Sequence, residues 1–194
     1  MISSVSVADI IHAWMARAGD TDISSIVNTL LYGIAVFAAA CRRRNLHHFK
    51  APRAERNYWL LLLFILLALG VNKQLDFQVL IVEIARPIAL QGGWYSSRRL
   101  VQAVFALLLT GMAGLFTAFV VILIRKHWEK NKLSLLGFLI LFVYFIIEAT
   151  SLGHLEEGLA AYKKWGIRLS DLIEMAGIIL IFINAIKYHK KGAG

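Results

Sequence analysis

The feature that most constrains this chain is a series of apolar blocks, each about as long as a helix that crosses a lipid bilayer. Such a helix needs about 20 mostly apolar residues, because the hydrocarbon core is about 30 Å thick. Five blocks qualify, at residues 23–41, 58–75, 100–124, 133–152 and 172–186. Hydrophobic residues make up 59% of the 194 residues. We therefore predict an all-α integral membrane helical bundle with five transmembrane helices, forming one membrane domain over residues 1–194.

The distribution of Lys and Arg predicts how this bundle is oriented. Cytoplasmic loops of membrane proteins are enriched in these residues. They concentrate after the first, third and fifth blocks: Arg42, Arg43, Arg44, Lys50, Arg53 and Arg56, then Arg125, Lys126, Lys130 and Lys132, then Lys187, Lys190 and Lys191. We expect an inner (plasma) membrane protein with its N-terminus outside and its C-terminus in the cytoplasm. Because topology explains the positive charge, no nucleic-acid partner is expected.

Two further segments are predicted to lie along the outer membrane surface. Residues 6–18 place apolar side chains at helical spacing, which is typical of an amphipathic interfacial helix. Residues 75–90 are also mostly apolar, but Glu83, Arg86 and Pro87 interrupt them. This second segment is therefore predicted to be an interfacial or re-entrant helix and not a sixth span.

Polar residues placed at membrane depth lie mostly near the predicted outer face. The hydrophobic run of the second span starts at Tyr58 and is only 14 residues long when polar residues interrupt it, in the stretch LALGVNKQLDFQVL. Three span ends meet this face, and we expect their polar residues to form one cluster: Asn72, Lys73, Asp76, Gln78, Glu148, His154, Asp171 and Glu174.

Glu148 is the sharpest single signal in this set, because it follows a long apolar run. An ionised carboxylate at such a depth costs about 2.5 kcal/mol or more unless it finds a partner. Lys73 and His154 are the candidate partners, and binding of a proton, ion or substrate is the alternative. Asp171 and Glu174 have the spacing of a helix capping box, although Glu174 lies deep enough to serve as a second carboxylate.

Other polar groups give weaker indications of binding. His154 and Glu148 are weak candidates for metal ligands, but no metal-binding spacing such as HExxH is present, so no metal site is predicted. Arg98 and Arg99, with Trp94 and Tyr95, suit contact with lipid headgroups or with an anionic substrate. No cofactor, pigment or substrate is identified by these patterns.

Small residues recur at close spacing in the first and third spans. They are Gly33, Ala35 and Ala39 in one, and Thr110, Gly114 and Ala118 in the other. Small side chains let membrane helices approach closely. We expect packing within this chain, with a seam between subunits as the alternative.

The stretches NKQLDFQ and QGGWYSSRRLVQ resemble a pattern, NKQLD-Q followed by QGWY--RR--Q, in a family of small bacterial inner-membrane proteins. This chain departs from the pattern by one extra glycine, Gly92 or Gly93. The resemblance implies a similar topology and no particular activity.

Three functions fit the sequence. The first is a subunit or accessory component of a membrane complex, which contacts the lipid bilayer and a partner membrane protein or further copies of itself. The second is an outward-facing enzyme or metal-binding protein that acts on a lipid or periplasmic substrate. The third is an ion- or proton-coupled transporter. The absence of nucleophile, phosphate-loop, dinucleotide and zinc-protease motifs weighs against an enzyme.

Overall fold

The computed structural model describes residues 7–15, 23–75, 80–81, 83–84, 87–88, 92, 98–150 and 169–187. Its helices are α1 (Val7–Met15), α2 (Ile23–His48), α3 (Arg53–Leu75), α5 (Arg98–Ile124), α6 (Trp128–Thr150) and α8 (Leu169–Lys187), with a short 3-10 turn, η2 (Arg125–His127), between α5 and α6. This part of the chain contains no β-strand, so the predicted all-α class is confirmed.

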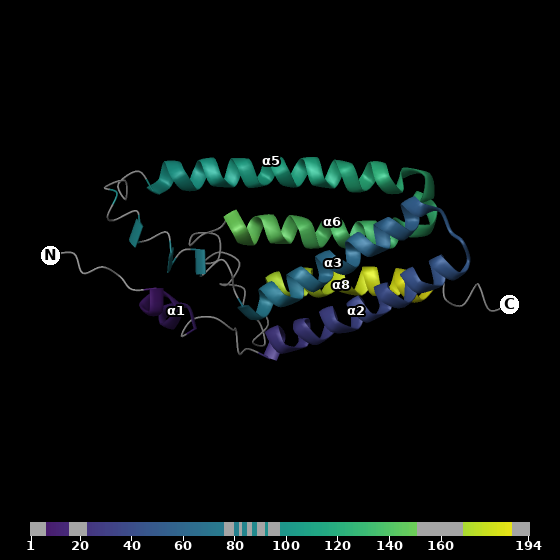
Figure 1. The fold of residues 1–194 in the computed structure, drawn as a ribbon, viewed down its shortest axis with the longest axis horizontal. Helices are drawn as coiled ribbons and strands as arrows, with labels where there is room; N and C mark the ends of the chain where they lie inside the picture. Colours follow the sequence, from purple (N-terminus) through teal and green to yellow (C-terminus); the bar gives the residue numbers. More distant parts are fainter. Residues whose placement is uncertain are drawn as a thin grey trace.

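The long helices run roughly along one axis (Figure 1). Within this bundle α2 packs against α3 and α8, and α6 packs against α8. α5 lies along the outside, where it contacts α6 and α3. The short helix α1 lies near the end at which α2 begins and α3 ends, where the Trp14 Nε1 atom donates a 2.8 Å hydrogen bond to the carbonyl oxygen of Leu75.

The buried face of α2 follows alternating steps of three and four residues. Its members are Ser25, Asn28, Tyr32, Ala35, Ala39, Arg42 and Leu46. Such steps keep one stripe of a helix turned toward its neighbours along its whole length. The stripe is apolar in the middle and polar at both ends. Two buried polar clusters therefore lie at opposite ends of an apolar core.

Two glycines let α6 and α8 pack closely. A Cβ atom built on Gly137 would lie 2.5 Å from the backbone oxygen of Gly177, and one built on Gly177 would lie 2.7 Å from the Cγ atom of Leu141. No side chain fits at such distances. The α6–α8 seam therefore depends on backbone approach of the kind that small residues permit.

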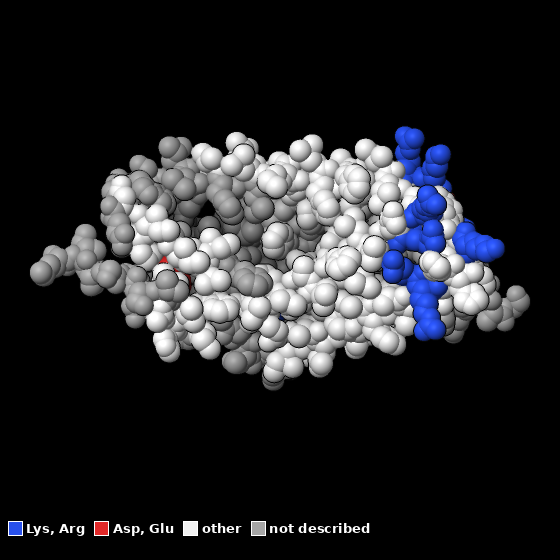
Figure 2. Space-filling view, in the orientation of Figure 1, with Lys and Arg blue, Asp and Glu red and all other residues white. Residues whose placement is uncertain are grey.

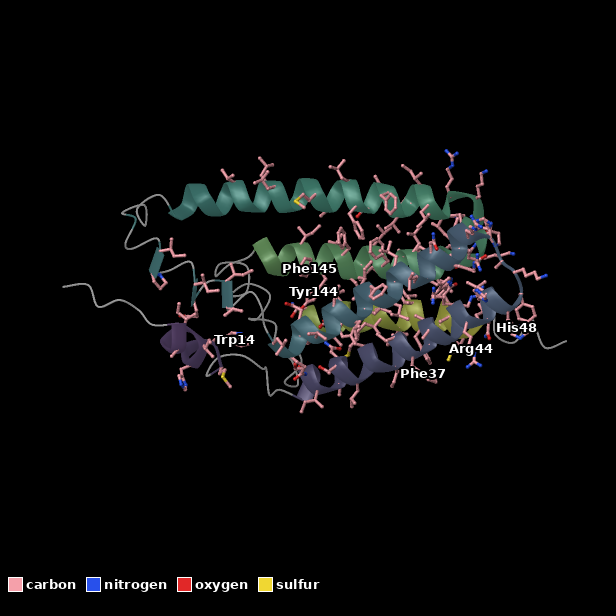
Figure 3. All side chains as sticks on the ribbon, in the orientation of Figure 1. Trp14, Phe37, Arg44, His48, Tyr144 and Phe145 are labelled. Carbon is pink, nitrogen blue, oxygen red and sulfur yellow. The ribbon has the colours of Figure 1, made fainter. Side chains whose placement is uncertain are left out.

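The outer surface of the bundle is apolar between its two ends. Phe37 on α2 is 73% exposed and Leu115 on α5 is 76% exposed, and Phe37 lies on the outward side of its helix (Figure 3). The central parts of the five long helices contain no Asp, Glu, Lys or Arg: residues 24–41, 57–72, 100–124, 133–147 and 175–186. Apolar surface of this extent is typical of a face that contacts lipid or another protein.

Two of the described helices are long and apolar enough to cross a membrane. They cover Ser24–His48 and Arg53–Leu75, each with a mean hydropathy of 1.7 in its best window. This criterion rests on length and composition. It supports α2 and α3 as candidate spans.

Basic side chains gather at one end of the molecule (Figure 2). At this end α2 and α5 finish and α3 and α6 begin. Arg44 and His48 mark it in Figure 3. We call it the basic end; the predicted cytoplasmic loops after the first and third spans meet there.

Helix α2 continues beyond the predicted span, from Cys41 to His48, and α3 begins at Arg53 instead of Tyr58. The predicted interfacial helix at 6–18 overlaps α1, and residues 80–81, 83–84 and 87–88 within the predicted helix at 75–90 are helical. The rest of that segment lies outside the described residues.

Candidate functional site

Five residues from three helices form a polar cluster at the end of the bundle opposite the basic end. Asn28 and Tyr32 come from α2, Lys73 from α3, and Asp171 and Glu174 from α8; we call them the Glu174 cluster. They meet because α2 and α8 begin at the end of the bundle where α3 finishes. The predicted antiparallel order of the spans is what brings these distant positions together.

Glu174 is the centre of this cluster and is only 2% exposed. Its Oε2 atom accepts a hydrogen bond from Asn28 Nδ2 at 2.7 Å, and its Oε1 atom accepts one from the Tyr32 hydroxyl at 2.9 Å. The Lys73 ammonium lies 3.1 Å from Oε2. A buried carboxylate with three donors retains much of the stabilisation that water would supply.

Lys73 joins both carboxylates of α8. Its Nζ atom also lies 3.4 Å from Asp171 Oδ1, and its side chain is 12% exposed. Asp171 lies in the first turn of α8, where the helix dipole favours negative charge. One ammonium therefore offsets two carboxylates, with the helix end and the neutral donors supplying further stabilisation.

Three buried oxygen atoms at this end have no hydrogen-bond partner within the described part of the chain. They are Ser25 Oγ, Asn28 Oδ1 and Asp171 Oδ2. An unpaired amide or carboxylate oxygen can accept a hydrogen bond or contribute to binding of a small cation. The cluster therefore combines paired charges with unused acceptor capacity.

A half-exposed network continues from the cluster toward the surface. Gln74 Nε2 donates a 2.6 Å hydrogen bond to Thr29 Oγ1, and the Thr29 hydroxyl donates to the Ser25 carbonyl oxygen at 2.9 Å. These contacts join the last turn of α3 to the second turn of α2. They extend the polar contacts between the two helices past Lys73.

Of the predicted polar cluster, the structure brings together Lys73, Asp171 and Glu174, and Asn72 lies half-buried beside Lys73 on α3. The remaining predicted site residues lie outside what the structure describes: Asp76, Gln78, Trp94, Tyr95 and His154, and the side chains of Arg98, Arg99 and Glu148. Their predicted roles remain predictions.

Asn28 and Tyr32 were not among the sequence-predicted site residues. Each stands in a mostly apolar block, where it resembles an ordinary packed residue. The signal that could have identified them is their spacing from Ser25 and Ala35, in steps of three and four on the buried face of α2. On that face, an Asn and a Tyr at membrane depth need polar partners.

A second buried cluster lies at the basic end. Arg42 of α2 lies 3.3 Å from Glu55 of α3, and its guanidinium carbon lies 6.0 Å from the centroid of the Trp59 ring. The Trp59 Nε1 atom donates to Asn131 Oδ1 of α6 at 3.0 Å. Arg42 and Glu55 are both buried, which makes this ion pair a fixed part of the α2–α3 turn.

Neutral hydrogen bonds complete this second cluster. The Tyr58 hydroxyl and Ser134 Oγ lie 3.0 Å apart, and Asn184 Nδ2 of α8 donates to the same Ser134 oxygen at 3.1 Å. At the basic end, polar contacts therefore link α2 to α3, and both α3 and α8 to α6, whereas the Glu174 cluster links α2 and α3 to α8 directly.

The described residues contain no group of three or more His, Cys, Asp or Glu side chains placed to hold a metal ion. Compared with known proteins, the chain matches no family model, and no curated protein or solved structure is significantly similar to it.

Proposed function

We propose that the chain is an integral membrane protein in which α2, α3, α5, α6 and α8 all cross the bilayer. Support comes from the uncharged central parts of these helices, from the exposed apolar side chains around them, and from the basic residues gathered at one end. The positive-inside rule then places the basic end in the cytoplasm and the N-terminus outside the inner membrane.

Within that membrane, we propose that the protein acts as a subunit or accessory component of a membrane complex, with α5 as the helix that contacts the partner. The observation that carries this proposal is the open face of α5. Leu107 is 73% exposed and Leu115 is 76% exposed. Between them, Cβ atoms built on Gly111 and Gly114 would have no heavy atom of the described chain within 4 Å.

This face combines apolar bulk with small-residue gaps. Close helix contact in membranes relies on such gaps, because lipid provides no hydrophobic drive for association. Thr110 and Ala118, which belong to the same small-residue series, are also exposed. The expected packing within this chain is therefore found for Ala35 and Ala39, which are fully buried. It is not found among the described residues for Gly33, which is exposed, or for the series on α5.

The Glu174 cluster fits this function as internal support. Glu174 and Asp171 are paired with Lys73 of the same chain, and Asn28 and Tyr32 add donors from α2. The cluster ties α2, α3 and α8 together, and none of the contacts described for it comes from α5. A rigid group of helices would then present α5 to a neighbour.

The test is site-specific photo-crosslinking in native membranes. p-Benzoylphenylalanine at Leu115 should give one discrete adduct, whose mass tells a second copy of the chain from a different membrane protein. Phe37 is the matched control, since it is equally exposed and apolar but lies on α2. When Gly114→Leu is added to the variant with the crosslinker at position 115, the yield of adduct should fall about tenfold. This corresponds to a loss of about 1.4 kcal/mol of association free energy.

Equal adducts from positions 115 and 37, or none from either, would reject α5 as the partner-binding helix.

The membrane topology is tested separately by cysteine labelling in intact cells. The cells express a variant of the protein in which Cys41 is replaced, so that each introduced cysteine is the single one. A membrane-impermeant maleimide should label Met15→Cys from outside and should label Lys130→Cys only after the membrane is opened. The reverse pattern would contradict the proposed orientation.

A further inference from the structure

A basic pocket opens where α2 ends and α3 begins. It has a volume of about 500 Å³ and is lined by His47, His48, Lys50, Ala51 and Arg56. No acidic residue of the described chain is among its lining residues. This hollow is shallow and widely open, and two permanent cations and two imidazole groups that can donate hydrogen bonds line it. That is the chemistry that binds a phosphate group.

The backbone of this pocket holds Lys50 in an unusual conformation. Helix α2 closes with hydrogen bonds from Lys50 N to the His47 oxygen at 3.2 Å and from Ala51 N to the Leu46 oxygen at 2.9 Å. This pattern is a Schellman motif, whose left-handed position is usually glycine. Here that position is Lys50, with a φ of 50°. A residue kept in a strained conformation points to a role for its side chain.

An apolar side chain lies beside these cations. Phe49 is 67% exposed, and its ring centroid lies 6.1 Å from that of His48. The pocket therefore presents cationic groups next to an exposed aromatic ring, at the end of the apolar outer surface. A ligand that has both an anionic phosphate and an acyl chain matches this combination better than a small soluble anion does.

We propose that this pocket binds the phosphate group of an anionic phospholipid, of which phosphatidylglycerol is the simplest example. The inference rests on the proposed membrane location, because only a chain in the bilayer brings the basic end to the headgroup level. Basic pockets on the cytoplasmic side of membrane helices are suited to such headgroups. Lys50 and Arg56 would contact the phosphate, and Phe49 would lie against the glycerol or the upper acyl chain.

The test measures lipid affinity of the full chain, purified in a non-ionic detergent and stripped of native lipid. Native mass spectrometry follows binding of dioleoylphosphatidylglycerol, with dioleoylphosphatidylcholine as the zwitterionic reference. Lys50→Gln with Arg56→Gln should weaken phosphatidylglycerol binding about tenfold or more, since two charge-assisted contacts are lost. The matched control, Lys126→Gln with Lys130→Gln, removes the same charge from the same end and should change binding less than about twofold.

A single variant, Lys50→Gly, separates the lipid contact from the fold. Glycine suits the left-handed backbone, so the variant should keep or raise the melting temperature while it weakens phosphatidylglycerol binding. A variant that keeps full lipid affinity would overturn the role of the Lys50 side chain.

Two results would overturn the proposal as a whole. One is equal loss of binding in both double variants, which would mean that net charge and not the pocket attracts the lipid. The other is displacement of phosphatidylglycerol by inorganic phosphate at equal concentration, which would identify a soluble ligand. Extraction of the wild-type chain from membranes by alkaline carbonate would instead reject the membrane location, so the two failures are distinguishable.

Discussion

Gly137 and Gly177 lie in a closed seam between α6 and α8, whereas Gly111 and Gly114 on α5 face open space. The same residue type therefore occurs in two opposite situations. In the seam, an added Cβ atom would meet backbone and packed side chains at 2.5 to 3.0 Å. On α5 it would meet nothing within 4 Å among the described residues.

The difference shows that small residues in a helix acquire their role from what lies opposite. The closed side of the molecule, formed by α2, α3, α6 and α8, also contains both buried polar clusters. On the open side, no described side chain of α5 contributes to either of them. Substitutions on the closed side should therefore reduce stability, while substitutions on the open side should affect association.

The largest effect is expected for Lys73→Met on the closed side. This substitution leaves the carboxylates of Asp171 and Glu174 buried without their ammonium partner, and breaking a buried ion pair in this way costs about 4 kcal/mol. Reversible unfolding in mixed micelles measures the loss. Lys132→Met is the control, because Lys132 pairs with Glu129 in an exposed contact and should cost less than about 0.5 kcal/mol. Equal losses in the two variants would contradict the assigned burial of the Glu174 cluster.

A direct comparison of the two kinds of glycine should give the next largest effect. Gly137→Leu forces α6 away from α8 and should cost about 3 kcal/mol, the upper range for overpacked sites. Gly114→Leu should not destabilise the protein, and should raise the unfolding free energy by up to about 1 kcal/mol, because glycine is a poor helix former. The same unfolding assay compares them. If both variants lose the same stability, α5 is packed as tightly as the seam and the contrast drawn above is wrong.

The smallest effect is expected for Tyr32→Phe, which removes one neutral donor from Glu174 and leaves the Lys73 contact intact. Hydrogen bonds between membrane helices contribute about 0.6 kcal/mol on average. A loss of about 1 kcal/mol or less is therefore expected in the same assay. A loss as large as that of Lys73→Met would show that the tyrosine hydroxyl, and not the ammonium, dominates the stabilisation of Glu174.

The positions of the long helices could be predicted from apolar blocks, but several of their ends could not. The block that forms α2 stops at Cys41, since charged residues follow, yet the helix continues to His48. Nothing in Arg42–His48 breaks a helix, and Arg42 finds Glu55 in the next helix. Hydropathy indicates which residues suit the hydrocarbon core of a bilayer, whereas helix ends depend on the turns that follow. Here α2 ends at the turn formed by Lys50, with its left-handed backbone, and by Pro52.

The candidate site could be predicted in part. Lys73, Asp171 and Glu174 stand out because charge at membrane depth is costly, and antiparallel spans bring them to one end. Asn28 and Tyr32 could not be selected from composition, since a single polar residue in an apolar block has many possible environments. Which donors reach Glu174 depends on how α2 is rotated about its axis, and that rotation is set by packing along the whole helix.

The pairing of Lys73 with α8 also has a consequence for biosynthesis. Its first carboxylate partner, Asp171, lies 98 residues further along the chain. At a translation rate of about 5 to 20 residues per second, α3 leaves the ribosome roughly 5 to 20 seconds before that partner is made. During this interval the ammonium at the end of α3 has no anion from α8, so the contact that joins α3 to α8 forms only late in synthesis.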